Sequence, residues 1–216
     1  MKKFAVVLSG CGVFDGAEIQ EAALSLLAIA KQGCSYEIFA PDIKQHHVVN
    51  HITGDEMEET RNVLVESARI ARGNIRDLKQ LNPASFDGLL FPGGFGAAKN
   101  LSTWAFEGAD ASVLPEVEEA ITGMLALKKP VGALCISPVI LAKILGEVHL
   151  TIGDDESTID ALESLGAKHV YTTHGEVVVD PDHKLVTTPC YMLDATIVQI
   201  AEGANNLVDA MIKLME

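Results

Sequence analysis

A single cysteine, Cys135, stands between a short apolar run and a segment with helical spacing. The run covers residues 131–134 and the helical segment covers residues 139–145. A strand that ends on a nucleophile and continues directly into a helix is the arrangement of a nucleophile elbow, which lifts the side chain above the sheet edge. Backbone N–H groups and the helix N-terminus then face the sulfur and favour the thiolate. The pattern predicts that Cys135 is a reactive thiol, although a free cysteine is also a common small core residue.

A glycine pair, Gly93 and Gly94, follows another predicted strand. Without a Cβ the backbone can turn there and leave N–H groups free to point into a cleft. Together with the N–H of Ile136, we expect these groups to hold an oxyanion. The alternative is a tight turn without a ligand, and the facing cysteine favours the oxyanion site.

Two acids, Glu18 and Glu21, stand at the start of the first predicted helix. A carboxylate at Glu18 can share a proton with the Cys135 sulfur or act as general acid and base, and Glu21 lies one turn further along the same face. Without further context, the sequence slightly favours the alternative that both are ordinary solvated acids of the first helical turn, which the helix dipole stabilises. Cys11, in the loop after the first predicted strand, is a further candidate for the cleft, but no elbow presents it. Cys34 and Cys190 are expected to be buried, Cys190 near the site.

Composition limits the classes of partner. The chain of 216 residues has a net charge of −14, which argues against nucleic acid and anionic membranes. No apolar run reaches membrane-spanning length. The four cysteines form no CxxC pair and no zinc spacing, so neither a disulfide framework nor a metal site is expected. The apolar start is too short for a signal peptide, and a cytoplasmic protein is therefore expected.

Apolar and helical patterns alternate along the chain, which predicts an α/β protein with a doubly wound, mostly parallel sheet, helices on both faces and a late β-hairpin. In such a sheet the loops after the strands share one edge, so the three candidate loops should meet. Strands are expected over residues 3–8, 36–40, 86–91, 131–134, 148–152, 169–172, 176–180 and 184–188. Helices are expected over residues 17–31, 62–72, 115–127, 139–145, 157–165 and 189–215, the last interrupted at Gly203.

Several motifs resemble the DJ-1/PfpI branch of the class I glutamine amidotransferase-like superfamily. They are PGGFGAAKN at residues 92–100, ALCISP at 133–138, and VVVD and LVTT at 177–180 and 185–188. Within this branch the chain resembles the bacterial enhancing-lycopene-biosynthesis (glyoxalase-like) subgroup more closely. The motifs of this resemblance are LSGCGVFDGAE at 8–18, NHITG at 50–54 and TRNVLVESARIARG at 60–73. The resemblance covers nearly the whole chain. It therefore implies that residues 1–216 form a single domain of this superfamily.

The resemblance implies a flavodoxin-like fold, a cytosolic homodimer and a cofactor-independent reaction. The reaction is the conversion of a small dicarbonyl, glyoxal, to glycolate by a glyoxalase-type lyase, or the deglycation of protein. The thiolate adds to the aldehyde, a carboxylate shuttles protons, and a thioester-level species is hydrolysed. By motif position the nucleophile is Cys135, its acidic partner is Glu18, and the turn glycines are Gly93 and Gly94. The subgroup's name also carries an isoprenoid-pathway association.

One departure from the superfamily concerns the base. Many members place a His after the strand that follows the elbow helix, but here Gly153 or Asp154 occupies that place. Asp154 is therefore a further site candidate, and the usual Cys-His pair is in doubt. Without a His the thiol depends on the helix N-terminus and on Glu18. A protonated Glu18 that donates to a low-pKa thiolate is the more consistent hypothesis.

Other functions remain open. The same thiol suits a non-enzymatic redox sensor whose Cys135 is oxidised. A glutamine amidotransferase would use His174 and Glu176, although they follow Cys135 closely. A dinucleotide site over residues 10–16 is weak, because the third glycine is one residue late.

Basic and metal-binding alternatives are weaker still. His46, His47 and His51 lie in a polar stretch without acidic partners at fixed spacing, so solvated histidines are expected. The arginines over residues 61–72 are expected to pair with the chain's own carboxylates.

Overall fold

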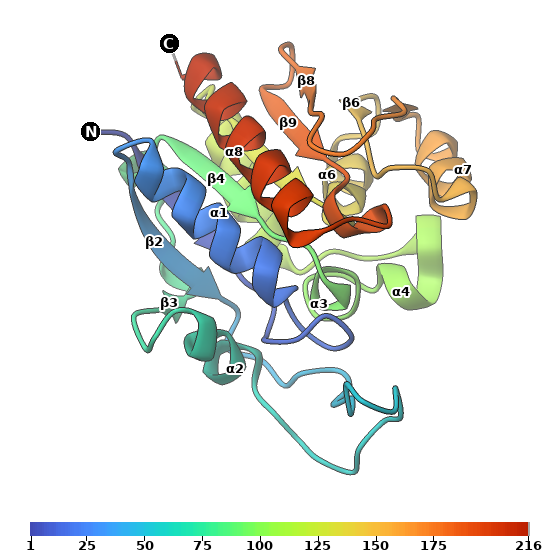
Figure 1. Cartoon of the computed structure of the whole chain (residues 1–216). Helices are drawn as coiled ribbons and strands as arrows, with labels where there is room; N and C mark the ends of the chain where they lie inside the picture. Colours follow the sequence, from blue (N-terminus) through green and yellow to red (C-terminus); the bar gives the residue numbers. More distant parts are fainter. Residues whose placement is uncertain (216) are drawn as a thin grey trace.

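The centre of the protein is a seven-stranded sheet with strand order β3-β2-β1-β4-β5-β9-β8 (Figure 1). The computed structural model describes residues 1–215. The strands are β1 (Lys3–Val7), β2 (Ser35–Ala40), β3 (Arg76–Asp77), β4 (Gly88–Phe91), β5 (Val131–Leu134), β8 (Val178–Asp180) and β9 (Leu185–Thr188). All neighbours pair in parallel except β8 and β9, which form the antiparallel hairpin. The predicted α/β, flavodoxin-like fold with a late hairpin is confirmed.

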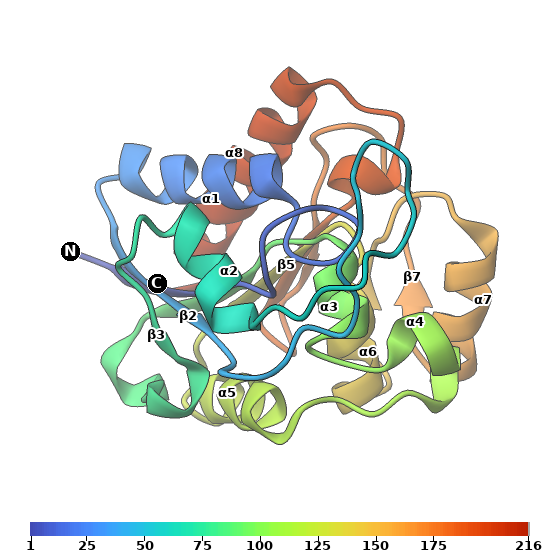
Figure 2. The ribbon, with the colours of Figure 1, turned by 90° about the horizontal axis from the view of Figure 1, so that it is seen from below.

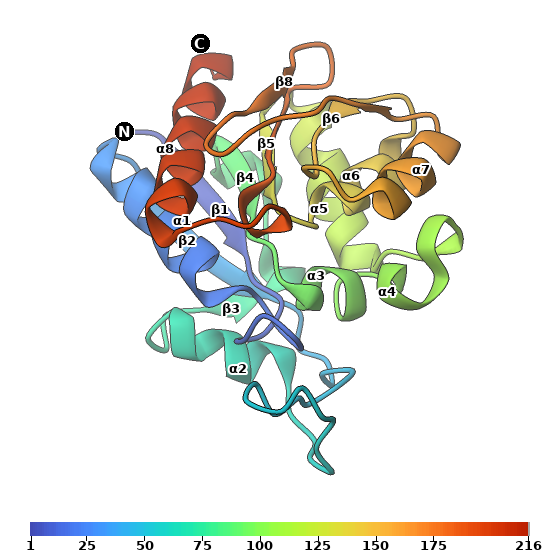
Figure 3. The ribbon, with the colours of Figure 1, turned by 45° about the vertical axis from the view of Figure 1, so that its right-hand side comes forward.

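Helices cover both faces of this sheet (Figures 2 and 3). Along β1, Phe4 and Val6 pack into one core while Ala5 and Val7 pack into the other, as the alternation of side chains along a strand requires. The first core lies under α1 (Ile19–Lys31) and α8 (Ile197–Leu214), which run side by side in Figure 1. The remaining helices are α2 (Val63–Ile70), α3 (Phe95–Lys99), α4 (Trp104–Glu107), α5 (Pro115–Ala126), α6 (Pro138–Leu145) and α7 (Glu156–Ser164).

Two strand glycines, Gly88 and Gly132, bring α8 directly onto β4 and β5. A Cβ on Gly88 would lie 2.6 Å from the Met215 side chain, and one on Gly132 would lie 2.4 Å from the Met211 sulfur. Only glycine allows this approach. The end of β5, where Cys135 follows, is therefore held between α8 and the neighbouring strands.

The C-terminal helix begins later than the sequence pattern predicts. Residues Cys190–Met192 form a separate 3₁₀ turn, and α8 starts at Ile197 behind a capping box made by Thr196 and Gln199. Gly203 is buried inside α8 and does not interrupt it. The hydrogen bonds of the capping box define this start, which apolar spacing alone does not show.

A small second sheet lies beside the hairpin. It pairs β6 (His149–Leu150) with β7 (Lys168–His169) in parallel, and both strands are shorter than expected. Asp180, buried at the end of β8, accepts from the backbone N–H of His149 at 2.8 Å and of His183 at 3.0 Å. Helix α7 is capped by Asp155, where Ser157 was expected. No helix within residues 1–215 is both long and apolar enough to cross a membrane.

Candidate active site

Cys135 occupies the elbow between β5 and α6. Its φ is +60°, a left-handed conformation that costs a non-glycine residue about 1–2 kcal/mol. The Cys135 N–H donates to the carbonyl of Thr188 on β9 at 3.0 Å, which anchors the turn to the sheet. The N–H groups of Gly94 and Ile136 contact the sulfur and act to lower its pKa. The structure thus shows the strained elbow that the sequence predicts.

The carboxylate beside this sulfur belongs to Glu21. Its side chain is 0% exposed, and its Oε2 lies with the Cys135 sulfur beside Gly93, where a Cβ would meet both atoms within 3 Å. Oε2 accepts from the N–H of Gly93 at 2.9 Å, and Oε1 accepts from the N–H of Tyr191 at 3.2 Å. Burial raises the pKa of Glu21 to about 8, against the lowering effect of these hydrogen bonds. Glu21 therefore exchanges a proton near neutral pH.

Glu18 takes a different role from the one expected. It is the N-cap of α1, and its carboxylate accepts from the backbone N–H of Glu21 at 2.6 Å. Partial burial raises its pKa. Because α1 starts at Ile19, the residue that faces the sheet edge is the one at the third helical position, Glu21. The predicted pairing of Glu18 with Cys135 is therefore corrected to Glu21, whose i,i+3 relation to Glu18 was the available signal.

The glycine pair makes the elbow and Glu21 fit together. A Cβ on Gly93 would lie 2.3 Å from the Cys135 Cβ and 2.6 Å from Glu21 Oε2, so no other residue fits. Since the N–H of Gly93 is taken by Glu21, it is not free for an oxyanion. Gly94, with φ of +95°, directs its own N–H to the sulfur. The expected oxyanion donors are thus reduced to Gly94 and Ile136.

The resting thiol of Cys135 does not have a lowered pKa. Burial, and next the charge of an ionised Glu21, raise the pKa of this thiol well above its ordinary value, despite the two N–H contacts. The expectation of a low-pKa cysteine is therefore wrong for the pocket with Glu21 ionised. Protonation of Glu21 removes the repulsion, while burial, the larger cause of the raised pKa, remains.

A cavity of about 310 Å³ opens onto the sulfur. Asp154, the predicted candidate, is exposed and does not line it, while the next residue, Asp155, does. Asp155 is the cap of α7 and comes from a part of the chain that no motif singled out. The cavity is lined by Val13, Gly94, Phe95, Cys135, Ile136, Asp155, Thr158, Tyr191 and Met192.

Cys190 is buried close to the site, as expected. It adopts a positive φ of 43° at the end of β9, next to the elbow strand. Burial, followed by the charges of Glu21 and Cys135, raises the pKa of its thiol. Two buried thiols and one buried carboxyl group therefore lie in the same region.

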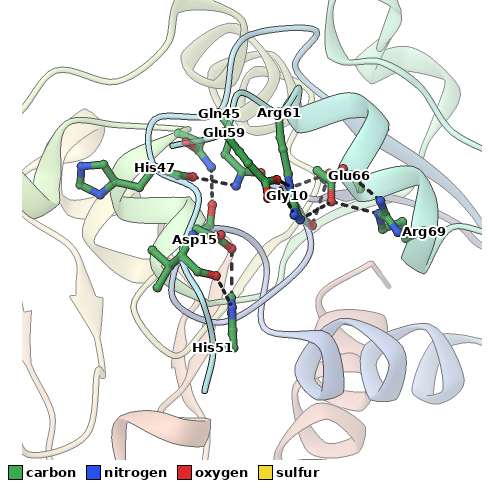
Figure 4. Close-up of polar contacts among 12 residues, drawn as sticks. Gly10, Asp15, Gln45, His47, His51, Glu59, Arg61, Glu66 and Arg69 are labelled. Atoms are coloured by element: carbon green, nitrogen blue, oxygen red, sulfur yellow. Dashed lines mark hydrogen bonds and ion pairs between the residues drawn. The ribbon is translucent and has the colours of Figure 1, made fainter. Parts of the chain in front are cut away.

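Cys11 lies elsewhere, in the loop after β1, and does not line the cavity. Burial and the charge of Glu66 raise the pKa of its thiol. Glu66 is itself clamped by Arg69 at 2.9 Å and by Arg61 at 3.5 Å (Figure 4). The expected pairing of these arginines with the chain's own carboxylates is confirmed.

The histidine loop between β2 and α2 packs against the loop after β1. His51 receives the N–H of Phe14 at 3.2 Å and lies 3.9 Å from the buried carboxylate of Asp15 (Figure 4). In Figure 2 this loop passes across α3, where the N–H of His46 donates to Asn100 at 2.9 Å. Within residues 1–215 no group of three or more His, Cys, Asp or Glu residues is arranged to hold a metal ion.

His174 does not join Cys135. Its Nε2 contacts the carbonyl of Asp194 at 2.9 Å, and it lines a separate groove of about 570 Å³ along α8. Glu176 accepts from the N–H of Thr173 in its own turn. The described residues therefore form no Cys-His-Glu triad from these side chains.

Comparison with known proteins gives two close relatives. The chain is 45% identical to the mitochondrial ES1 protein homolog of Rattus norvegicus, over 98% of this chain and 84% of the relative. It is also 45% identical to the mitochondrial glutamine amidotransferase-like class 1 domain-containing protein 3 of Homo sapiens, over 98% and 83%. Both names specify mitochondria, which contradicts the expected cytoplasmic location. No family model matches the chain.

Solved structures agree with these relatives. An isoprenoid biosynthesis protein with an amidotransferase-like domain from Ehrlichia chaffeensis has a TM-score of 0.93 and 35% identity, with 100% of both chains covered. A ThiJ/PfpI domain protein from Brachyspira murdochii shares the fold, with a TM-score of 0.61 and 15% identity over 98% and 96% of the two chains. The chain belongs to the family of the ES1 and glutamine amidotransferase-like class 1 domain proteins.

Proposed function

We propose that this protein is a cofactor-independent enzyme of the glyoxalase type, which converts glyoxal to glycolate with Cys135 as nucleophile and Glu21 as proton shuttle. One observation carries the proposal: a fully buried Glu21, with a pKa of about 8, lies beside a thiol in a strained elbow. A group that exchanges its proton near the working pH is suited to general acid and base catalysis.

The first step is addition of the thiol to the aldehyde. The sulfur bonds to the carbonyl carbon, the π electrons move to oxygen, and the thiol proton reaches that oxygen through Glu21. This produces a hemithioacetal. The N–H groups of Gly94 and Ile136 contact the sulfur, so they are placed to stabilise the thiolate and the developing oxyanion.

The second step moves hydrogen between the two carbons. Ionised Glu21 removes the proton from the sulfur-bound carbon while the neighbouring carbonyl oxygen takes up a proton, which gives an enediol. A proton is then delivered to the neighbouring carbon and the hydroxyl on the sulfur-bound carbon loses its proton, which yields a glycolyl thioester. Water then cleaves the C–S bond, releases glycolate and restores the thiol. The net change is addition of one water to glyoxal, with no external oxidant or reductant. At pH 7 about one tenth of Glu21 is in the ionised form that this step needs.

The test is turnover. Purified protein is incubated with excess glyoxal, and glycolate is measured by NMR. We expect many equivalents of glycolate for each subunit, and none above background with Cys135→Ala. At most one equivalent of glyoxal lost for each subunit, without glycolate, contradicts the proposal.

A second candidate function is a redox sensor, and the burial of Cys190 beside Cys135 favours it. A hydroperoxide oxidises the Cys135 thiol to sulfenic acid and is reduced to an alcohol or water. The Cys190 thiol then displaces hydroxide from that sulfur, which gives a disulfide and water. Peroxide-dependent loss of two hydrogens in intact mass, absent in Cys190→Ser, distinguishes this function from turnover of glyoxal.

We also propose that the protein forms a homodimer and that the chain is one functional domain. Ile197 and Val198 at the start of α8 and Ile19 at the start of α1 are exposed apolar side chains on adjacent helices. Such side chains favour association. Sedimentation of the full chain at micromolar concentration tests the dimer, and a monomer mass contradicts it.

A further inference from the structure

The cavity above Cys135 differs in size and chemistry from what glyoxal requires. Resting on the proposed function, we infer that the preferred substrate is an uncharged 2-oxoaldehyde with an apolar substituent of the size of an isobutyl group. Glyoxal is then the minimal member of the class.

Size is the first argument. The cavity measures about 310 Å³, at the lower end of pockets that hold organic ligands larger than a few atoms. Glyoxal fills roughly 60 Å³, on the order of two water volumes. Most of the cavity therefore remains for a substituent on the second carbonyl carbon.

The chemistry of the walls is the second argument. Val13, Phe95, Ile136 and Met192 present apolar side chains to the cavity. A substituent that buries apolar surface against them contributes about 25 cal/mol for each Å². Binding energy from such a remote group can be used at the reacting carbons.

The polar groups in the lining are already engaged. The Asp155 carboxylate accepts from the N–H of Thr158 at 2.8 Å and from the hydroxyls of Ser157 and Thr158. The Tyr191 hydroxyl donates to Gln20, and the Tyr191 N–H donates to Glu21. These polar groups are few among the apolar lining, so a polar substituent would lose hydration against the apolar walls.

Charge is the last argument. No Lys, Arg or His is among the lining residues, and the hydrogen bonds from Thr158 lower the pKa of Asp155, which keeps it anionic. Lys99 lies over the ring of Phe95 at 5.1 Å, but it donates to the carbonyl of Phe14 and does not line the cavity. A carboxylate or phosphate on the substrate is therefore disfavoured.

For 4-methyl-2-oxopentanal the chemistry balances as for glyoxal. The thiol adds across the aldehyde. The proton of that carbon is transferred to the ketone carbon through Glu21, the hydroxyl proton moves to the ketone oxygen, and water cleaves the resulting thioester. The product is 2-hydroxy-4-methylpentanoate. The isobutyl group remains on the ketone carbon, on the side of the apolar walls.

The experiment compares three aldehydes on the full-length protein. They are glyoxal, 4-methyl-2-oxopentanal and 4,5-dioxopentanoate, which has one methylene more and a carboxylate in place of the branched end. We expect kcat/KM for 4-methyl-2-oxopentanal to exceed both others by about tenfold or more, which corresponds to about 1.4 kcal/mol. The Val13→Phe variant fills part of the cavity. In this variant, kcat/KM for 4-methyl-2-oxopentanal divided by kcat/KM for glyoxal should fall several-fold.

Equal or better turnover of glyoxal or of 4,5-dioxopentanoate overturns the inference and leaves the proposed function standing. If none of the three is turned over, the proposed function fails. The aldehydes can then still be ranked by how well each one, as a reversible hemithioacetal, protects Cys135 from labelling by maleimide. The labelling is measured in a Cys11→Ser, Cys34→Ser background. Protection at lower concentrations of the isobutyl compound supports the inference, and equal protection by all three contradicts it.

Discussion

Two regions at the same sheet edge each hold a cysteine beside a buried glutamate, and they differ in one respect. At the elbow, Glu21 faces the Cys135 thiol and two backbone N–H groups but no cation. Near Cys11 in the loop after β1, Glu66 of α2 is clamped by Arg61 and Arg69. Burial without a counter-charge raises the pKa of Glu21, whereas Glu66 forms ion pairs with two arginines. The difference separates a proton-transfer pair from a structural clamp.

Removing the thiol tests this comparison most strongly. Cys135→Ser should lower glyoxal turnover about 10³-fold or more, because the nucleophile is lost. Cys11→Ser is the matched control and should stay within about twofold of the unmodified protein. A comparable loss of glyoxal turnover in both variants would show that Cys135 is not the nucleophile that sets the two regions apart.

The choice between acids is the next test. Glu21→Gln should lower kcat about 10²-fold or more, since general acid and base catalysis is removed while the shape is kept. Glu18→Gln keeps an acceptor at the cap of α1 and should change kcat only a few-fold. The reverse order of the two effects, measured at one pH, would restore Glu18 as the acid of the site.

The pH dependence of stability isolates the buried acid. The pKa of Glu21 is raised by folding from 4.5 to about 8, so its contribution is fully present below about pH 4.5 and is lost as pH rises to 8. At about 1.4 kcal/mol for each pKa unit, the free energy of unfolding should fall by a few kcal/mol over this range. Glu21→Gln should flatten the curve, as urea unfolding at several pH values can measure; an unchanged slope would rule out Glu21 as its source.

The clamp should affect stability and not chemistry. Glu66→Ala leaves two arginines without their shared partner and should cost about 2 kcal/mol, less than for a fully buried pair because both arginines are partly exposed. Glyoxal turnover at a temperature below the unfolding transition should change little. A large loss of kcat with unchanged stability would mean that Glu66 acts at the active site.

Much of the fold follows from sequence patterns, and the errors have physical causes. The continuous apolar run at β5 and the alternating helices predict a parallel sheet correctly, since both depend on short-range spacing. The two-residue strand β3 and the short helix α3 were missed, because segments of this length carry no periodicity. The start of α8 was missed because its capping box, not its apolar spacing, defines the boundary.

The sequence by itself determined the elbow, with Cys135 at the junction of an apolar strand and a helix, and the motifs that placed the chain in its superfamily. Only the tertiary structure decided which acid faces the sulfur. A shift of one turn moves the carboxyl group from the half-buried cap at Glu18 to the fully buried position at Glu21. The burial of Glu21 in that interior then raises its pKa, against the hydrogen bonds from the N–H groups of Gly93 and Tyr191. These properties depend on distances between segments far apart in the chain, and a linear pattern does not contain them.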